Sequence, residues 1–238
     1  MLILGIDTST DILGLALLKE NKLLGEYNLN LKRQHSEKLL PLLKEIFNHL
    51  DLTLRDLDGV AVAVGPGSFT GLRIGITTAK MLGRIFSIPV KGISTLEIMA
   101  AGVENNYLLP LLDARRKRVY YSFYKKSNSE PENIFLEQIK EAASTNISEL
   151  PQILAAYRQE KIVLVGEKTA EVKEIMTKNG FIVKKASDEK NTPRAAVLAE
   201  LGLAYIKAGD QDDIYKLKPA YLKKPQAEIN WQQKYGSK

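Results

Sequence analysis

Apolar residues open the chain in three short runs that predict β-strands at residues 2–7, 12–18 and 22–29. The spacing then becomes helical over residues 36–50, where large apolar side chains form a wide stripe. Pro41 lies in the second turn of this helix and is expected to kink or shorten its start. The first half of the chain therefore begins as a strand meander followed by an amphipathic helix.

Strands and helices alternate along the rest of the chain, with a break in the pattern at residues 102–106. The expected elements are a strand at 60–64, a helix at about 70–86, a strand at 89–93, a short helix from Ser94, a strand at 162–165, a helix at 169–178, a strand at 181–185 and a helix at 193–209. Such alternation favours an α/β fold over one in which helices and strands are segregated.

The opening pattern recurs after the break. The stretch LILGIDTSTDILGLALLK at residues 2–19 resembles LLPLLDARRKRVYYSFYK at residues 108–125, so that Asp7 aligns with Asp113. In both copies a strand ends in aspartate, turns, and is followed by a second alternating strand. We interpret this similarity as a duplication that produces two lobes.

The expected division is a first lobe at residues 1–103, a second lobe at 104–222 whose last helix, 193–209, packs back on the first lobe, and a basic tail at 223–238. The formal net charge is +6, but residues 216–238 hold six lysines and one glutamate, so the rest of the chain is nearly neutral. The tail is either a solubilising terminus or an arm that contacts a polyanion such as RNA.

Composition narrows the classes of protein. A hydrophobic content of 45% with 26% charged residues is typical of a globular protein and excludes disordered and fibrous classes. The absence of cysteine excludes disulfides, thiolate metal sites and a cysteine nucleophile. The N-terminal apolar run ends at Asp7, too soon for a signal peptide or a membrane span. We therefore expect a cytoplasmic protein that does not bind membranes.

The segment GPGSFTGLRIG at residues 65–75 stands where a strand passes into a helix, a place where glycines often let backbone N–H groups approach an anion. It departs from each known motif at a specific position. A P-loop requires Lys and Ser/Thr where Leu72 and Arg73 stand. A dinucleotide fingerprint requires glycine in place of Thr70, and a nucleophile elbow requires serine in place of Phe69.

The turns after the two aligned strands resemble the phosphate loops of actin-like kinases and ATPases. The first contains Asp7, Thr8 and Ser9, and the second contains Asp113 and Arg115. Those phosphate loops usually contain a glycine that lets the backbone approach phosphate, and neither turn has one. We interpret both as degenerate phosphate loops, and reading them as ordinary hairpin turns leads to the same functional conclusion.

Side chains for other chemistry are sparse. His35 and His49 are fourteen residues apart, so neither has a second histidine one helical turn away for metal binding. Ser68 with His35 would be a hydrolase pair without supporting spacing. We expect no catalytic, cofactor-binding or metal-binding residues, and no cofactor.

The helix at residues 70–86 carries small residues at every fourth position. Each glycine costs about 1 kcal/mol of helix propensity, so this seam indicates close packing against another helix, from this chain or from a partner. Together with the apolar stripe at 36–50, the seam supplies the residues expected to bind a partner, which are Leu39, Leu43, Phe47, Gly71, Leu72, Gly75, Ala79 and Gly83.

Several motifs occur in a characteristic order along nearly the whole chain. They are IDTST (6–10), QHSEKLLPLL (34–43), GPGSFTGLRIG (65–75), STLEIMA (94–100), PLLDARRKRVYY (110–121) and PAYLKK (219–224). Together they resemble the TsaB (YeaZ) family. That resemblance implies an actin-like (ASKHA, ribonuclease H-like) duplicated two-lobed fold.

The resemblance also implies a non-catalytic subunit that binds and activates the transferase TsaD. The complex would form threonylcarbamoyladenosine next to the anticodon of tRNAs that read codons beginning with A, with the nucleotide-binding protein TsaE as a further partner. TsaD-like proteins carry an HxxxH metal pair, whereas here Leu39 stands four residues after His35.

Two further expectations follow. The isolated chain should form a homodimer, and tRNA should be contacted indirectly or through the basic tail. Two alternatives stay open, an independent actin-like ATPase or small-molecule kinase, and a peptidase.

Overall fold

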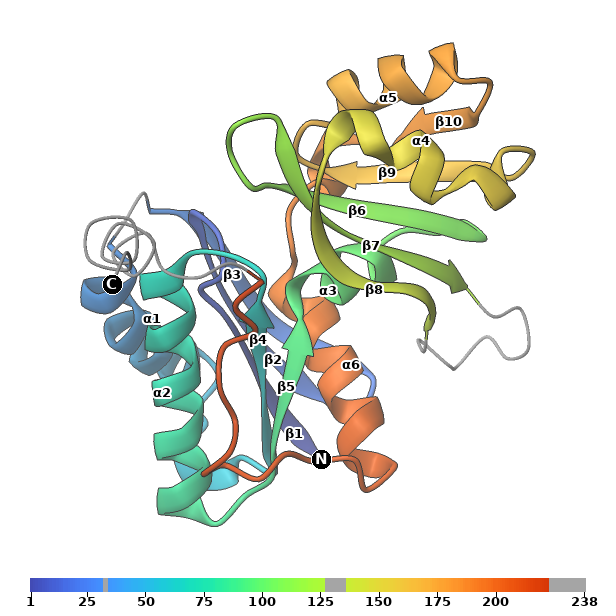
Figure 1. Ribbon diagram of the computed structural model, residues 1–238. Coiled ribbons are helices and arrows are strands. Elements are labelled where there is room, and N and C mark those ends of the chain that lie inside the picture. The colour runs from blue at the N-terminus through green and yellow to red at the C-terminus, as the bar shows by residue number, and fades with distance from the viewer. Residues whose placement is uncertain (32–33, 127–135, 223–238) are drawn as a thin grey trace, which may run out of the picture.

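The computed structural model describes residues 1–31, 34–126 and 136–222, which form two α/β lobes (Figure 1). Within these residues each lobe contains a five-stranded sheet, with strand order β3-β2-β1-β4-β5 in the first lobe and β10-β9-β6-β7-β8 in the second. In each sheet the first three strands along the chain are antiparallel, and the last two extend the sheet in parallel. The two lobes therefore share one topology, as expected for a duplication.

The elements of the first lobe are β1 (Leu2–Asp7), β2 (Ile12–Lys19), β3 (Lys22–Asn30), α1 (His35–His49), the 3₁₀ turn η1 (Leu54–Asp56), β4 (Gly59–Gly65), α2 (Phe69–Phe86), β5 (Val90–Ser94) and α3 (Thr95–Ala101). The remaining elements are β6 (Tyr107–Asp113), β7 (Arg118–Lys126), β8 (Leu136–Asn146), η2 (Ile147–Glu149), α4 (Leu150–Ile153), η3 (Ala155–Tyr157), β9 (Lys161–Gly166), α5 (Thr169–Lys178), β10 (Ile182–Lys185), η4 (Asp188–Lys190) and α6 (Ala195–Lys207).

The expected elements are present, with two differences. Helix α1 starts at His35 and continues through Pro41, so of the two expected effects of this proline, a kink or a shortened start, the shortened start does not occur. Strand β8 and the helical turns at residues 147–157 were not predicted from the sequence.

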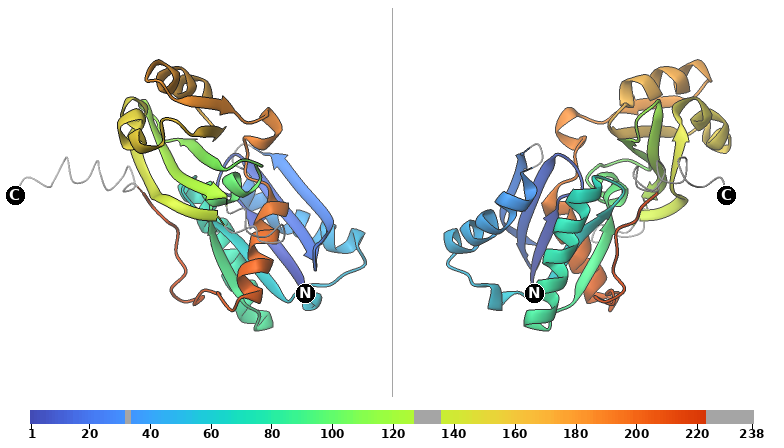
Figure 2. Two further views of the ribbon diagram at one scale, coloured as in Figure 1. Left: turned by 90° about the vertical axis from the view of Figure 1, so that its right-hand side faces the viewer. Right: turned by 60° about the vertical axis from the view of Figure 1, so that its left-hand side comes forward.

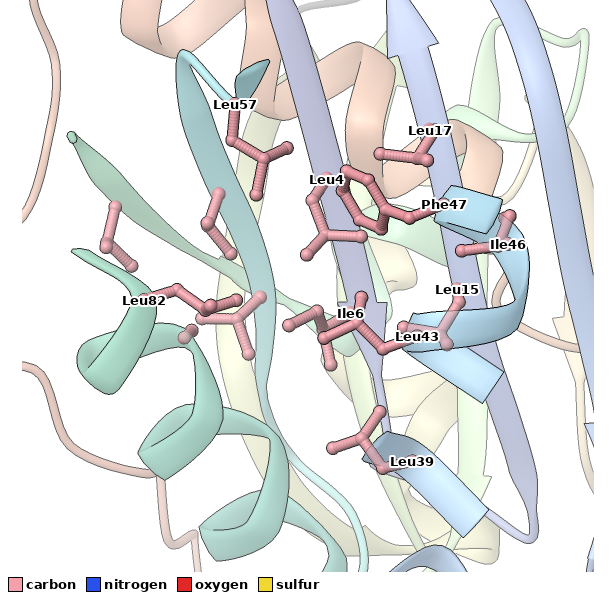
Figure 3. Close-up of a cluster of buried hydrophobic side chains, with 14 of the residues drawn as sticks. Leu4, Ile6, Leu15, Leu17, Leu39, Leu43, Ile46, Phe47, Leu57 and Leu82 are labelled. Atoms are coloured by element: carbon pink, nitrogen blue, oxygen red, sulfur yellow. The ribbon is translucent and has the colours of Figure 1, made fainter. Parts of the chain in front are cut away.

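The first sheet is covered on both faces (Figure 1). Alternation along β1 sends Leu4 and Ile6 into a core shared with α1 and α2, as Figure 3 shows, and sends Ile3 into a second core with α6. A strand buried on both faces reads as a continuous apolar run, which explains the sequence of β1.

Helix α6 lies after the second lobe in the sequence but packs on the first sheet. Gly202 brings it against β4, since a Cβ on this residue would lie 2.3 Å from the Cβ of Ala61. Residues 208–222 then return along the lobe, where the N–H of Ala220 donates to the carbonyl of Val64 over 2.8 Å. We call residues 208–222 the C-terminal strap.

Helix α3 lies between the lobes. Its Ile98 packs in the core of α6, while Leu96 and Met99 pack against the second sheet. Helices α4 and α5 cover the other face of that sheet, around Leu164 and Phe123. The views in Figure 2 show the two lobes as separate bodies joined in this region.

Candidate functional site

The turn after β1 is covered by the glycine loop that begins α2. The N–H of Ser68 donates to the carbonyl of Ser9 over 2.6 Å, and the hydroxyl of Thr8 donates to the carbonyl of Gly71 over 2.7 Å. A Cβ on Gly71 would lie 2.0 Å from the carbonyl oxygen of Thr8, and one on Gly67 would lie 2.2 Å from that of Ser9. The glycines therefore allow two segments of the same chain to approach each other, and the backbone of this loop occupies the space above the turn.

Three polar side chains are buried together beside this contact. Asp7, Ser9 and His35 are each at most 5% exposed. The N–H of Ser9 bonds to Asp7 Oδ1 over 2.7 Å, and His35 Nε2 lies 2.7 Å from the carbonyl oxygen of Thr10. Asp7 Oδ2, Ser9 Oγ and His35 Nδ1 have no hydrogen-bond partner within the described residues. Burial raises the pKa of Asp7, and its hydrogen bonds and the nearby His35 oppose this shift.

These three residue types are those of a hydrolase triad, but their burial excludes a bound substrate in this conformation. Spacing along the chain does not bring these three residues together, and the serine that the sequence paired with His35 is Ser68. Ser68 instead caps α2, where its hydroxyl accepts a hydrogen bond from the N–H of Gly71 over 3.3 Å.

The equivalent turn of the second lobe is open. Asp113 and Arg115 are exposed, and the N–H of Arg115 donates to Asp113 Oδ1 over 2.8 Å. The N–H of Asp113 in turn donates to Glu167 Oε2 over 2.5 Å. The two predicted degenerate phosphate loops thus differ, one closed by backbone and the other exposed.

The seam on α2 packs on the first lobe's own sheet. A Cβ on Gly75 would lie 2.5 Å from Thr8 Oγ1, and one on Gly83 would lie 2.5 Å from Val90 Cγ2, so both glycines face the lobe's own sheet. All the side chains predicted to bind a partner are buried in the lobe, namely Leu39, Leu43, Phe47, Gly71, Leu72, Gly75, Ala79 and Gly83. In this structure the small side of α2 packs on the lobe's own sheet, so contact of these residues with a partner stays a prediction, and among them Leu39 also lines the hollow between α1 and α2 described below.

The exposed surface of α1 and α2 has a different apolar set. Leu40 is 54% exposed on α1, and Met81 and Ile85 are 44% and 62% exposed on α2. A hollow of about 440 Å³ lies between the two helices and is lined by Ser36, Leu39, Leu40, Phe69, Thr70, Arg73, Ile74, Thr77 and Thr78. We call Leu40, Ile74, Met81 and Ile85 together with this hollow the α1/α2 face.

The sequence held a signal for this face. Helix α2 is apolar around most of its circumference, at Ile74, Met81 and Ile85 as well as along the side that includes the seam. A helix that is apolar on nearly all sides has more apolar surface than contact with one sheet can bury. The small residues and the large exposed residues lie on different sides of α2. The seam of small residues therefore did not indicate the exposed apolar face.

The C-terminal strap borders the α1/α2 face. The ring of Tyr221 stacks on Phe69 with a centroid distance of 4.4 Å, and the guanidinium of Arg73 lies 4.0 Å from the centre of the Phe69 ring. Arg73 Nε donates to the Tyr221 hydroxyl over 3.0 Å, and Lys80 Nζ donates to the carbonyl of Leu217 over 3.2 Å. The strap thereby fixes the cationic side of α2 and leaves its apolar side exposed.

Metal clusters and membrane-spanning helices are both absent from the described part of the chain. Among residues 1–31, 34–126 and 136–222, no group of three or more His, Asp or Glu side chains is placed to hold a metal ion. No helix in the same part of the chain is long and apolar enough to cross a membrane. The basic tail, residues 223–238, lies outside the described residues.

Sequence comparison identifies the family. The family model described as TsaD, tRNA N6-adenosine threonylcarbamoyltransferase, matches residues 22–231. The tRNA threonylcarbamoyladenosine biosynthesis protein TsaB of Bacillus subtilis (strain 168) is 34% identical over 237 residues, which cover 97% of this chain and 98% of that protein. The chain belongs to the TsaB family. The TsaB protein of Escherichia coli (strain K12) is 35% identical over 133 residues, or 54% of this chain and 57% of that protein.

Solved structures support the fold. YeaZ from Pseudomonas aeruginosa superposes with a TM-score of 0.75 at 23% identity, covering 93% of this chain and 99% of that one. The ROK hexokinase from Thermus thermophilus superposes with a TM-score of 0.51 at 10% identity, covering 88% of this chain and 100% of that one. The actin-like fold expected for a TsaB protein is confirmed, and the TsaB family is involved in the biosynthesis of threonylcarbamoyladenosine in tRNA.

Proposed function

We propose that this chain is a non-catalytic scaffold subunit that binds and activates a TsaD-like transferase. The complex would form threonylcarbamoyladenosine next to the anticodon of tRNAs that read codons beginning with A. The observation that carries the proposal is the α1/α2 face, where large apolar side chains stay exposed beside a hollow although the lobe has a complete core of its own. Exposed apolar patches of this kind are typical of protein interfaces.

The chemistry of this face fits a related subunit as the partner. Leu40 on α1 and Ile85 on α2 are exposed, and the hollow between the helices has Arg73 as its single charged lining residue. Lys44 and Arg84 are exposed on the same two helices. A transferase with the same fold would present an equivalent helix pair, and two such pairs could pack as a four-helix contact. An apolar centre with a polar rim is the usual composition of an interface.

The first lobe supports a role without phosphate chemistry. The backbone of residues 67–71 occupies the space above the turn at Thr8 and Ser9, where an actin-like enzyme would hold phosphate. Asp7 is buried at the base of that turn. A nucleotide could reach it only if the start of α2 moved away.

Further parts of the proposal concern the partners. A TsaE-like nucleotide-binding protein would join the heterodimer, and tRNA would be contacted indirectly or through the basic tail. In the absence of the transferase, the α1/α2 face would pair with a second copy of the chain, since a large apolar face is rarely left in water. We propose a cytoplasmic location for this complex.

Turnover by the isolated chain separates a scaffold from the alternatives, an actin-like ATPase or kinase and a peptidase. We expect no ATP or peptide hydrolysis above background by the purified chain, because the turn at Thr8 is closed and the Asp7, Ser9 and His35 group is buried. The assay measures phosphate release and peptide cleavage for the wild type and for Asp7→Ala. Turnover that persists through further purification and is lost in Asp7→Ala would show an enzyme.

A further inference from the structure

The turn between β6 and β7 has an unusual backbone. Arg115, Arg116 and Lys117 are consecutive and have φ angles of +63°, +52° and +60°. A left-handed conformation costs a residue with a side chain roughly 1–2 kcal/mol, and here three non-glycine residues adopt it in succession. Such strain persists only where surrounding contacts impose it, and it is concentrated at functional sites.

Hydrogen bonds from both ends of the turn impose this conformation. Asp113 Oδ1 accepts from the N–H of Arg115, and the carbonyl of Arg115 accepts from the N–H of Arg118 over 3.1 Å. The carbonyl of Lys117 accepts from the N–H of Ile147 over 3.0 Å, and Arg118 Nη2 donates to the carbonyl of Ser144 over 2.6 Å. The turn is therefore held rigidly on β7 and β8.

The side chains of the turn are free of ion pairs. Arg115, Arg116 and Lys117 are all exposed, and none forms a salt bridge within the described residues. The nearby carboxylates of Asp113 and Glu167 accept backbone N–H groups of the turn, as described above. Three cations thus stand on a rigid tip that projects beyond the end of the second sheet (Figure 1).

We propose that the β6–β7 turn contacts the phosphodiester backbone of RNA, with Arg116 and Lys117 neutralising phosphates. The inference rests on the proposed function, in which the RNA is the tRNA held by the assembled complex. A long polyanion that passes over an exposed tip fits this geometry better than a small anion, because small ligands are bound in pockets that enclose most of their surface. A rigid mount lowers the entropy cost of ordering the side chains.

Contacts of this kind position an RNA without reading its sequence. They would fix the second lobe against the tRNA while the transferase on the α1/α2 face of the first lobe acts on the base. This assigns tRNA contact to a named part of the folded lobe, in addition to any contribution from the basic tail.

The test uses the complex assembled with the TsaD-like transferase and measures its affinity for substrate tRNA as a function of salt. The variant Arg116→Asn/Lys117→Asn removes two charges, and asparagine tolerates the left-handed backbone, so the turn should keep its fold. The matched control is Lys184→Asn/Lys185→Asn, which removes two exposed lysines from β10 in the same lobe. A second variant, Arg116→Lys/Lys117→Arg, keeps the charge of the turn.

We expect the turn variant to weaken tRNA binding about ten-fold at low salt and to lower the slope of log K against log salt by about 1 to 2, the value for two lost phosphate contacts. The β10 control and the charge-preserving variant should bind as the wild type does. Equal affinity and slope for the turn variant and the wild type would overturn the inference, as would an equal loss in the β10 control.

Further outcomes distinguish failure of the RNA contact from failure of the proposed function. A turn variant that loses affinity for ATP while its tRNA affinity is unchanged would assign the cations to nucleotide phosphate and contradict the RNA contact. Failure of the unmodified chain to assemble with the transferase would overturn the proposed function itself, and the inference with it. If the wild type assembles with the transferase and modifies tRNA, but the turn variant binds tRNA as tightly as the wild type does, the RNA contact is overturned and the proposed function is not.

Discussion

At the scale of single residues, Thr8 and Gly71 join the turn after β1 to the start of α2. They are 63 positions apart, yet the Thr8 hydroxyl donates to the Gly71 carbonyl and the Ser68 N–H donates to the Ser9 carbonyl. The first bond pairs the buried Thr8 hydroxyl, and the second pairs the backbone carbonyl of Ser9. Asp7 is buried beside this contact. The start of α2 therefore covers both the β1–β2 turn and the carboxylate of Asp7.

The first prediction concerns Gly71. In Gly71→Ala the added Cβ would meet the Thr8 carbonyl oxygen at 2.0 Å, and this backbone atom cannot move away cheaply. We expect the free energy of unfolding to fall by about 3 kcal/mol, the upper part of the range for overpacking, as measured by urea denaturation. Gly102→Ala is the control, because its Cβ would have no neighbour closer than 3.6 Å and should leave stability nearly unchanged. If Gly71→Ala and Gly102→Ala were equally stable, the close approach of Gly71 to the Thr8 carbonyl would be contradicted.

The second prediction concerns the pH dependence caused by Asp7. Its pKa is raised in the folded state by burial, so the folded chain holds a proton that the unfolded chain releases from about pH 4 upward. This group therefore lowers the free energy of unfolding as pH rises from about 4 to the folded pKa. Asp7→Asn keeps an oxygen that accepts from the Ser9 N–H but cannot ionise, so it removes this fall in the free energy of unfolding.

We expect Asp7→Asn to gain stability relative to the wild type as pH rises through this window, measured by urea denaturation at a series of pH values. His35 is the neighbouring titratable group, so the comparison is repeated with His35→Gln in both backgrounds. A wild type that gains stability relative to Asp7→Asn over the same window would show that the carboxylate is stabilised in the fold.

At the scale of elements, α2 has separate sides with separate tasks. Its small residues pack on the sheet, its cationic side bonds to the C-terminal strap, and its remaining apolar side chains are exposed. The glycines lower the helix propensity of α2, but they let its backbone approach β1 and β5. Close packing on one side therefore leaves the large side chains on the other side available for a partner.

The third prediction tests the exposed side. Ile85→Glu should prevent both self-association and binding of the transferase, costing about 2 kcal/mol or more if Ile85 is central to the interface. Light scattering and titration calorimetry measure the two associations, and circular dichroism should show an unchanged fold because Ile85 is 62% exposed. Ile182→Glu on β10, at an exposed position in the second lobe, is the control. Native association by Ile85→Glu would place the interface elsewhere.

The elements were largely predictable from the sequence because their apolar patterns are strong and the duplication repeats them. Strand β8 was missed because most of its residues are polar or small, with only Leu136 and Ile139 as large apolar side chains. The direction of the α2 seam was not predictable, since a row of glycines permits close packing on a sheet or on a helix alike. The pairing of Asp7 and Ser9 with His35 depends on how α1 starts beside the β1–β2 turn, which spacing along the chain does not encode.

At the scale of the whole molecule, two lobes of one topology have diverged in their turns. In the first lobe the turn after β1 is buried beneath the start of α2, and in the second the turn after β6 is exposed and cationic. The proposed protein and RNA contacts therefore lie on different lobes of one actin-like fold.

The most direct test of the account is threonylcarbamoyladenosine formation on substrate tRNA with all components present except this chain. Transferase, TsaE-like protein, threonylcarbamoyl-AMP and tRNA are combined with no addition, with the wild type, or with Ile85→Glu, and the modified base is quantified. We expect product only with the wild type, and none when the wild type is supplied without the transferase. Full product without the chain, or with Ile85→Glu, would contradict a scaffold that acts through the α1/α2 face.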